Sequence, residues 1–154
     1  MPLRLLHTLR QGAKTYRAGL LQAKVYRILK DETAKILKPA KISTLEWALL
    51  GALSDYRQGL QLKVLADKLG VEPAFVTVMV QALKKRGLVT RISHEHDKRS
   101  KVASLTEAGV VFIQRTEKML RGDIRPLFTG INARDLLAYL RVLSAIEKNA
   151  ASKK

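Results

Sequence analysis

The chain has 154 residues, which is enough for one domain with a hydrophobic core. Its 29 Lys and Arg against 13 Asp and Glu give a formal net charge of +16, which predicts a polyanionic partner, nucleic acid before anionic membrane. Cysteine is absent, which excludes disulfides, thiolate metal sites and a cysteine-based oxidation sensor.

The N-terminal region is basic, and residues 1–30 contain no acid. That bias is typical of a transit peptide, but the same stretch has no serine, which argues against one. Arg4, His7 and Arg10 interrupt it, so it also lacks the apolar centre of a signal peptide. No apolar run approaches the length of a membrane span. We therefore expect a basic helix of the mature protein and no membrane partner.

One long helix is predicted over residues 8–38, because apolar residues recur at helical spacing and no proline intervenes before Pro39. Gly12 and Gly19 are its weak points. The helix carries many cations, which is unusual for a helix that packs only within its own domain. Two interpretations remain: the helix packs against a partner chain, or it lies as a basic amphipathic helix on a membrane.

Ser43 and Glu46 stand three residues apart as a capping box, which predicts that a helix begins at Thr44. We expect this helix to run to about Leu53. Residues 54–60 are polar around a glycine and are predicted to form a loop. The residues expected in the core are Trp47, Leu49, Leu50 and Leu53.

Two short helices are predicted next. Residues 62–69 have apolar side chains at helical spacing, and Gly70 stands where a helix commonly ends in a left-handed residue. Pro73 fits the first position of the second helix, because it has no N–H to leave unsatisfied there. Cations at residues 84–86 occupy its last turn, where the helix dipole favours them. Its predicted buried stripe comprises Val76, Met79, Val80 and Leu83.

After Gly87 the pattern changes to that of β-strands. Residues 88–92 are rich in β-branched side chains, and residues 102–105 alternate. The polar stretch 93–101 between them predicts a β-hairpin with a long basic tip. A helix, a tight turn, a second helix and a hairpin in this order form a winged helix-turn-helix, whose second helix enters the DNA major groove.

A connecting helix is predicted over residues 107–121, with Thr106 as its N-cap. Gly122, Pro126 and Gly130 then predict a break in the helix.

The last helix is predicted to begin after its N-cap, Asn132, and to end near residue 149. Its apolar side is wide enough to bury against a partner as well as against its own chain. The residues expected at a dimer interface are Leu136, Leu137, Leu140 and Leu143.

The run LADKLGVEPAFVTVMVQALKKRGLVTR, followed by HDKRSKVASLTEAG, closely resembles the MarR family of bacterial transcription regulators. The wing motif of that family is matched at its usual spacing by Asp97, Lys98, Arg99, Leu105, Thr106 and Gly109.

The resemblance covers residues 8–149 by order of elements, and it implies the organisation of the chain. We expect a single MarR-like domain, 1–154, that is mostly α with a small antiparallel β-hairpin: a winged helix-turn-helix with long terminal dimerisation helices. Residues 8–38 and 132–149 would be the dimerisation helices. Residues 43–121 would be the winged helix-turn-helix lobe and its connecting helix.

The second helix of the lobe carries the candidate base contacts. If its predicted stripe faces the core, the opposite side faces the groove. The family usually has Ser or Thr near position 74 and Arg near position 78, and both are apolar here, so a strong Arg-to-guanine contact is missing. The alternative is that Ala74, Phe75 and Val78 are buried against another element. The residues on the groove side are Ala74, Thr77, Val78, Gln81 and Lys85.

In the hairpin, the resemblance implies that Arg99 enters the minor groove and that Asp97 orients it. A carboxylate holds a guanidinium in one plane, and narrow A·T-rich grooves attract arginine. The alternative is an ordinary solvated hairpin. The cations expected to meet phosphates are Arg91, Lys98 and Lys101, and Lys84 and Lys85 are further candidate DNA-binding residues.

His94 and His96 share one face of a strand and resemble a metal-binding pair. The third histidine, His7, is far away in sequence, and a third ligand would have to be Asp97, which is assigned to Arg99. We therefore expect no metal and no cofactor. No nucleophile pattern, phosphate-binding loop or paired-carboxylate motif is visible, so the chain is not expected to be an enzyme.

The family commonly binds small aromatic or phenolic ligands between the dimer helices and the DNA-binding lobe. For each candidate here, a plain core or surface role is the alternative. The candidate pocket residues, by position, are Tyr16, Arg17, Tyr26, Trp47 and Tyr56.

Together these features predict a cytoplasmic, nucleoid-associated transcription regulator of a bacterium or archaeon. Its expected partners are double-stranded DNA, a second copy of the chain and a small-molecule effector of unknown identity. We expect a dimeric repressor at a pseudo-palindromic, A·T-rich operator, relieved by that effector. Two alternatives are a basic protein that packages nucleic acid without sequence preference, and an interaction module that docks to a membrane or protein through its first helix.

Overall fold

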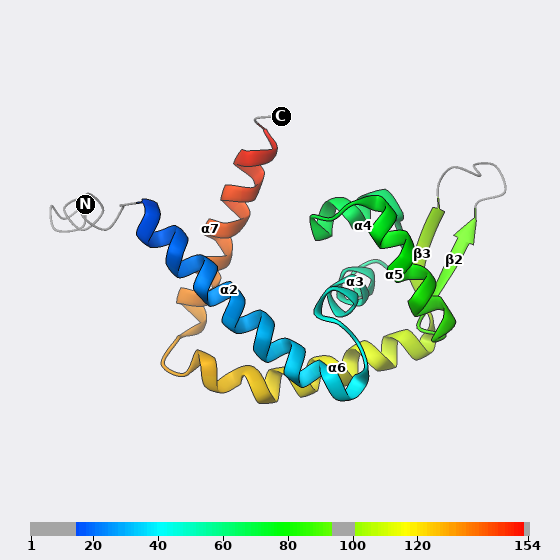
Figure 1. Ribbon diagram of the computed structural model, residues 1–154, viewed down its shortest axis with the longest axis horizontal. Helices are drawn as coiled ribbons and strands as arrows, with labels where there is room; N and C mark the ends of the chain where they lie inside the picture. The colour runs from blue at the N-terminus through cyan, green and yellow to red at the C-terminus, as the bar shows by residue number, and fades with distance from the viewer. Residues whose placement is uncertain (1–14, 94–100, 153–154) are drawn as a thin grey trace, which may run out of the picture. The chain divides into compact units, whose positions relative to one another are not determined.

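The computed structural model describes residues 15–93 and 101–152 (Figure 1). The chain divides into two units, Met1–Gly122 and Asp123–Lys154. The first unit contains α2 (Thr15–Leu37), the 3-10 helix η1 (Lys38–Ala40), α3 (Thr44–Ser54), β1 (Leu60–Gln61), α4 (Leu62–Leu69), α5 (Pro73–Lys85), β2 (Val89–Ser93), β3 (Lys101–Leu105) and the start of α6 (Glu107–Ile124). The second unit contains the end of α6, the 3-10 helix η2 (Arg125–Phe128) and α7 (Ala133–Ala151).

The fold is mostly helical with a small antiparallel sheet, as predicted. The sheet has three strands in the order β1-β3-β2 rather than two. Leu60 pairs with Ala103 in the added strand. Just before it, Gly59 has a φ of +82°, and a Cβ there would lie 2.4 Å from the Ala103 carbonyl oxygen. The prediction of a loop over residues 54–60 is therefore wrong at Leu60, because a two-residue strand is too short to show alternation.

The hydrophobic core of the first unit lies between α3, α4, α5 and the sheet. Trp47, which was expected in the core, is half-buried and packs against it. The largest fully buried side chains are Leu37, Leu49, Leu50, Leu53, Leu65, Leu83, Val76, Val80 and Val89.

The predicted helix boundaries are largely confirmed by their caps. The Ser43 side chain accepts from the Glu46 N–H, and the Glu46 carboxylate accepts from the Ser43 N–H. Asn132 accepts from the Asp135 N–H at the start of α7. Thr106 accepts from the Gly109 N–H at the start of α6.

The predicted break between the connecting helix and the last helix is confirmed, although α6 runs past Gly122 to Ile124. A glycine inside a helix costs only about 1 kcal/mol, which the rest of a long helix tolerates. The chain leaves the α-helix where Pro126 follows, in the 3-10 helix η2. No helix in the described part of the chain is long and apolar enough to cross a membrane.

Replacing either of two glycines of α6 with alanine is expected to change the stability of the fold in opposite directions. A Cβ at Gly109 would lie 2.0 Å from the Leu88 carbonyl oxygen, whereas a Cβ at Gly122 would meet nothing within 4 Å. We expect Gly109→Ala to lower the free energy of unfolding by about 1–3 kcal/mol or more, because the backbone must move. Gly122→Ala should raise it by about 0.5–1 kcal/mol through helix propensity.

Urea denaturation followed by circular dichroism measures both changes, with Gly122→Ala as the matched control. Equal effects of the two substitutions would contradict the close packing of α6 on the start of β2.

Candidate nucleic-acid interface and ligand pocket

The apolar stripe of α5 is buried as predicted. Pro73 stands at its first position, and Lys84 and Lys85 fill its last turn. Burial of the stripe fixes the rotation of the helix about its own axis. The exposed fractions in the stripe are 0% for Val76, 6% for Met79, 1% for Val80 and 0% for Leu83.

The opposite side of α5 faces outward, and between its ends it carries no charged side chain. Val78 is 61% exposed and Phe75 is 51% exposed. The alternative prediction, that these residues are buried against another element, is therefore wrong for the chain on its own. Thr77 is half-buried, and its hydroxyl donates to the Pro73 carbonyl oxygen at 3.1 Å. The other exposed residues of this outward face are Ala74, Gln81 and Lys85.

The turn between α4 and α5 is short and held by its backbone. Gly70 takes the left-handed conformation, with a φ of +65°. The Val71 N–H donates to the Ala66 carbonyl oxygen at 3.1 Å, which closes the end of α4. This is the helix-turn-helix predicted from Gly70 and Pro73.

The two strands of the predicted wing pair in one register. Val89 lies opposite Leu105, and Arg91 lies opposite Ala103. The predicted tip residues His94, His96, Asp97, Lys98 and Arg99 lie outside the described residues, as do the side chains of Arg91 and Lys101. In the part of the chain that the structure describes, no group of three His, Asp or Glu could hold a metal ion.

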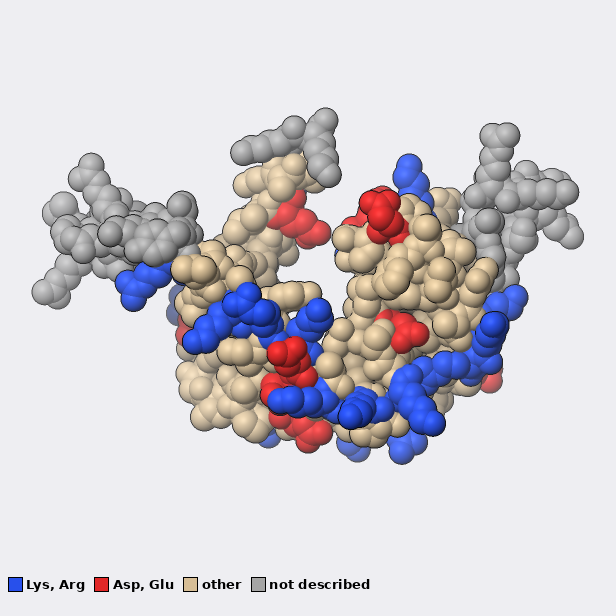
Figure 2. All heavy atoms as spheres, viewed as in Figure 1, with Lys and Arg blue, Asp and Glu red and all other residues tan. Residues whose placement is uncertain are grey.

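Arg86 joins three elements at the C-terminal end of α5, a role that its position in the sequence did not reveal. Its guanidinium donates to the Lys41 carbonyl oxygen at 2.8 Å and to the Ala40 carbonyl oxygen at 3.0 Å. The same group lies 5.5 Å from the centre of the Phe112 ring of α6. Lys41 itself has a φ of +52°. Figure 2 shows Lys and Arg side chains in a band along this edge of the first unit.

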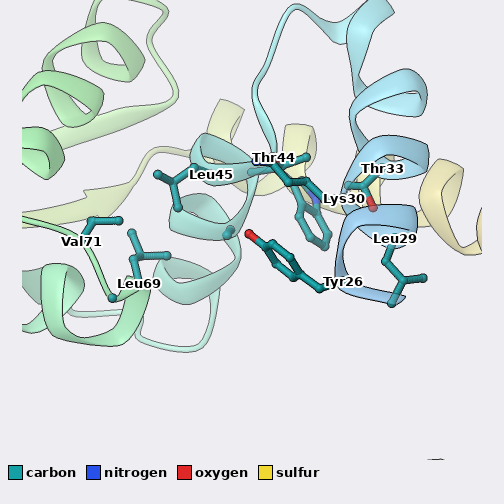
Figure 3. Close-up of a pocket in the computed structure, with 11 residues that line it drawn as sticks. Tyr26, Leu29, Lys30, Thr33, Thr44, Leu45, Leu69 and Val71 are labelled. Atoms are coloured by element: carbon teal, nitrogen blue, oxygen red, sulfur yellow. The ribbon is translucent and has the colours of Figure 1, made fainter. Parts of the chain in front are cut away.

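A pocket of about 480 Å³ lies between α2, α3 and the turn of the helix-turn-helix. Tyr26 extends from α2 across it, with its hydroxyl directed toward α3 (Figure 3). The pocket is lined by Tyr26, Leu29, Lys30 and Thr33 of α2, by Thr44, Leu45, Trp47 and Ala48 of α3, and by Leu69, Gly70 and Val71.

The structure thus brings together two of the candidate pocket residues, Tyr26 and Trp47. Arg17 is exposed on α2 and is not among the lining residues. Tyr56 is 41% exposed, and its ring lies 5.1 Å from the Lys68 ammonium instead. The side chain of Tyr16 lies outside the described residues.

The indole N–H of Trp47 is buried and has no hydrogen-bond acceptor among the described residues. A buried donor without an acceptor costs about 1–3 kcal/mol, which makes such groups rare. Sequence reasoning missed both this donor and Lys30, because neither lies in a motif. Both become apparent only in the structure, where α2, α3 and the turn after α4 line one pocket.

Residues 40–100 match the model of the MarR family. The winged helix-turn-helix is therefore similar to that of MarR-family transcription regulators. The fold of the MarR-like chain matches a MarR-family transcriptional regulator from Rhodococcus sp. RHA1 with a TM-score of 0.79 at 21% identity, covering 88% of this chain and 96% of that chain. It matches the transcriptional regulator PA3341 with a TM-score of 0.75 at 27% identity, covering 87% and 98%. It matches NadR, in complex with 4-hydroxyphenylacetate, with a TM-score of 0.73 at 22% identity, covering 85% and 91%.

In the second unit of the MarR-like chain, the apolar side of α7 is exposed. None of its residues is buried, in a helix of 19 residues that the structure describes throughout. Leu137 is 56% exposed, Leu140 is 49% exposed and Leu136 is 37% exposed, while Leu143 is half-buried.

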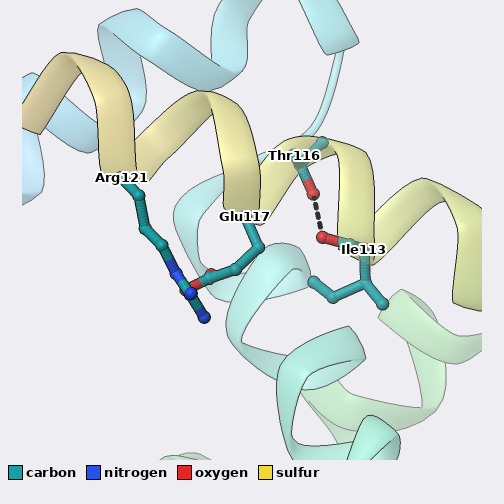
Figure 4. A network of polar contacts seen from close by, with 4 residues as sticks. All are labelled: Ile113, Thr116, Glu117 and Arg121. Atoms are coloured by element: carbon teal, nitrogen blue, oxygen red, sulfur yellow. Dashed lines mark hydrogen bonds and ion pairs between the residues drawn. The ribbon is translucent and has the colours of Figure 1, made fainter.

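A second, polar hollow of about 400 Å³ lies between the end of α3 and α6. Of its lining residues, Glu117 is already partnered, since its carboxylate accepts from the Arg121 Nε at 3.0 Å (Figure 4). On the same helix the buried Thr116 hydroxyl donates to the Ile113 carbonyl oxygen at 3.1 Å.

Proposed function

We propose that the chain is a dimeric transcription repressor that binds a pseudo-palindromic, A·T-rich operator. The observation that carries this proposal is the outward face of α5, whose rotation follows from its buried stripe. Ala74 and Val78 expose short apolar side chains there, and Gln81 is the amide among them. Such a face suits the major groove of A·T-rich DNA, because thymine presents a methyl group and adenine presents a donor and an acceptor that one amide can bond.

The rest of the DNA contact would come from charge. Under this proposal Arg99 enters the minor groove, oriented by Asp97. The phosphate contacts would be made by Lys84, Lys85, Arg91, Lys98 and Lys101. Because the base contacts are apolar or made by a single amide, much of the affinity would come from phosphates and depend strongly on salt.

The dimer would form through the terminal helices, 8–38 and 132–149. The exposed leucines of α7 support this proposal, because an apolar stripe of that length is seldom left in water. A two-fold dimer would place two α5 helices about one DNA turn apart, which is roughly 34–36 Å. The lobe over residues 43–121 would then bind one half-site.

A small-molecule effector would bind in the pocket around Trp47. The NadR structure contains 4-hydroxyphenylacetate. A ligand of that chemistry suits this pocket, since the unpaired Trp47 donor and the Lys30 ammonium both favour an acceptor or an anion. Leu69 and Val71 of the helix-turn-helix line the same pocket, so an occupant would touch the segment that positions α5.

A second candidate function is the packaging of nucleic acid without sequence preference. The net charge of +16 favours it, as does the absence of arginine from the middle of α5.

Selection from random duplexes separates the two candidates. We expect an A·T-rich palindromic consensus with an adenine opposite Gln81, and Gln81→Ala should cost about 1–3 kcal/mol of discrimination at that position. Val78→Arg should shift one position of each half-site toward guanine. A consensus that is G·C-rich, or that Gln81→Ala leaves unchanged, would contradict the proposed orientation of α5, and uniform binding would favour packaging.

Dimerisation is tested by Leu140→Glu, which places a charge in the apolar stripe of α7. We expect the wild-type chain to sediment as a dimer at micromolar concentration and this variant as a monomer, because burying an unpaired carboxylate is costly. The matched control is Val111→Glu, since Val111 is 64% exposed on α6. A monomeric wild-type chain with full affinity for an operator would refute the dimer.

Effector binding is tested by the emission of Trp47, the sole tryptophan of the chain. Addition of 4-hydroxyphenylacetate should change this emission, and Lys30→Met should weaken the binding, because it removes the cation at the pocket. Lys24→Met, on the exposed side of the same helix, is the control. An unchanged emission at millimolar ligand, or equal weakening by both substitutions, would count against this pocket.

A further inference from the structure

The positive charge of the chain is concentrated outside the lobe that contains α5. Residues 1–41 hold ten Lys or Arg against two acids, so they carry +8 of the +16. Residues 42–106, which comprise α3 to β3, hold ten Lys or Arg against six acids. The proposed operator contact therefore leaves half of the net charge unexplained.

Much of the described part of that charge lies on the outward side of α2 and just past its end. The inward side is identified by Leu37, which is fully buried, and by Leu29 and Ile36, which are half-buried. About 180° away around the helix, at 100° per residue, stand three exposed cations of α2 and, among its described residues, one acid, Asp31. A fourth exposed cation, Lys38, follows directly as the first residue of η1. We call these four cations the basic ridge: Arg17, Lys24, Arg27 and Lys38.

Lys35 also lies on this side, but it is partly neutralised within the helix. Its ammonium donates to the Glu32 carboxylate, and this hydrogen bond raises the pKa of Lys35. The ion pairs among the described residues are Lys35 with Glu32 and Arg121 with Glu117. Within those residues, no ridge cation has a carboxylate partner.

Beyond Lys38 the ridge continues toward the lobe. Lys41 is exposed, and its carbonyl oxygen accepts from Arg86 at the end of α5. Figure 2 shows the Lys and Arg side chains over α2 and past its C-terminal end toward the end of α5, with a cluster of acids beside them. Both segments belong to the first unit.

The length and chemistry of the ridge fit the backbone of a nucleic acid duplex. From Arg17 to its end at Leu37, α2 spans about 30 Å at a rise of about 1.5 Å per residue, which is close to one turn of B-DNA. A protein partner would have to bury four cations, which is costly unless each is paired. An amphipathic helix on a membrane needs a free apolar side, whereas the C-terminal end of α2 packs into the core of the lobe through Ile36 and Leu37. Leu20, Leu21 and Ile28 nearer its start are exposed, so binding to vesicles is one outcome of the test below.

We propose that the basic ridge binds the phosphate backbone of duplex DNA without reading its sequence, in addition to the bases contacted by α5. The bound DNA is either the flank of the operator duplex or a second duplex. In both cases the ridge neutralises phosphates and releases counterions, so it contributes to the salt dependence of binding and leaves the base preference unchanged.

The test compares two triple variants of the full chain, each with three fewer positive charges. The ridge variant loses three of the four ridge cations through Lys24→Gln, Arg27→Gln and Lys38→Gln. The α7 variant loses three exposed cations of α7 through Arg134→Gln, Arg141→Gln and Lys148→Gln. Affinity for a duplex of random sequence is measured over a range of salt. Each lost phosphate contact should reduce the slope of log K against log salt by about 0.9, so the ridge variant should lose about 2–3 and the α7 variant much less.

Equal losses in the two variants would overturn the proposal, because net charge alone would then explain them. An unchanged slope in the ridge variant would also overturn it. Circular dichroism confirms that both variants fold. Because the duplex contains no operator, a failure of sequence recognition by α5 does not alter this measurement.

Two further measurements show whether the ridge contacts the operator duplex or a second duplex. If longer flanks on one duplex strengthen wild-type binding and not binding by the ridge variant, the ridge contacts the operator duplex. If the wild-type chain joins two short duplexes in one complex and the ridge variant does not, the ridge contacts a second duplex. The wild-type chain and the ridge variant are also sedimented with vesicles that contain anionic phosphatidylserine. If the ridge variant loses binding to these vesicles while its salt slope with DNA is unchanged, the ridge binds a membrane and not DNA.

Discussion

The outward residues of α5 depend on the four apolar side chains that bury its other side. Val76, Met79, Val80 and Leu83 leave the helix one favourable rotation against the core. A shift of this stripe by one residue would turn the helix by about 100° and replace its outward residues with others. The chemistry offered to a partner is therefore set by residues that the partner never touches.

The end of α5 is also tied to its neighbours, so the helix and the hairpin are positioned together. The Thr106 N–H donates to the Leu88 carbonyl oxygen at 3.1 Å, and Gly109 allows α6 to pass close to that same carbonyl. Arg86 holds the connection between α2 and α3 from the other side. A movement of α2 would thus be felt at the C-terminal end of α5. The pocket around Trp47 lies between α2, α3 and the turn that precedes α5.

Local patterns predicted the helices, their caps and the buried stripe of α5, because each depends on residues within a few positions of one another. The capping box of Ser43 and Glu46 is such a case. The third strand was missed because its partner, Ala103, is far away in sequence. Arg86 was missed for the same reason, since its acceptors lie 45 and 46 residues earlier. Of the candidate pocket residues, Tyr26 and Trp47 line a pocket of the structure, whereas Lys30 and the unpaired indole donor could be found only from the assembled structure.

The side chains on the outward face of α5 also bear on cytosine methylation. Thr77 commits its hydroxyl to the Pro73 carbonyl oxygen, and Ala74 and Val78 have no polar atoms in their side chains. A 5-methylcytosine presents its methyl group at the same edge of the major groove as thymine does. In the proposed binding mode, these residues would contact that methyl group without losing a hydrogen bond to it. A regulator of this kind would tolerate, or favour, operators that carry the modified base.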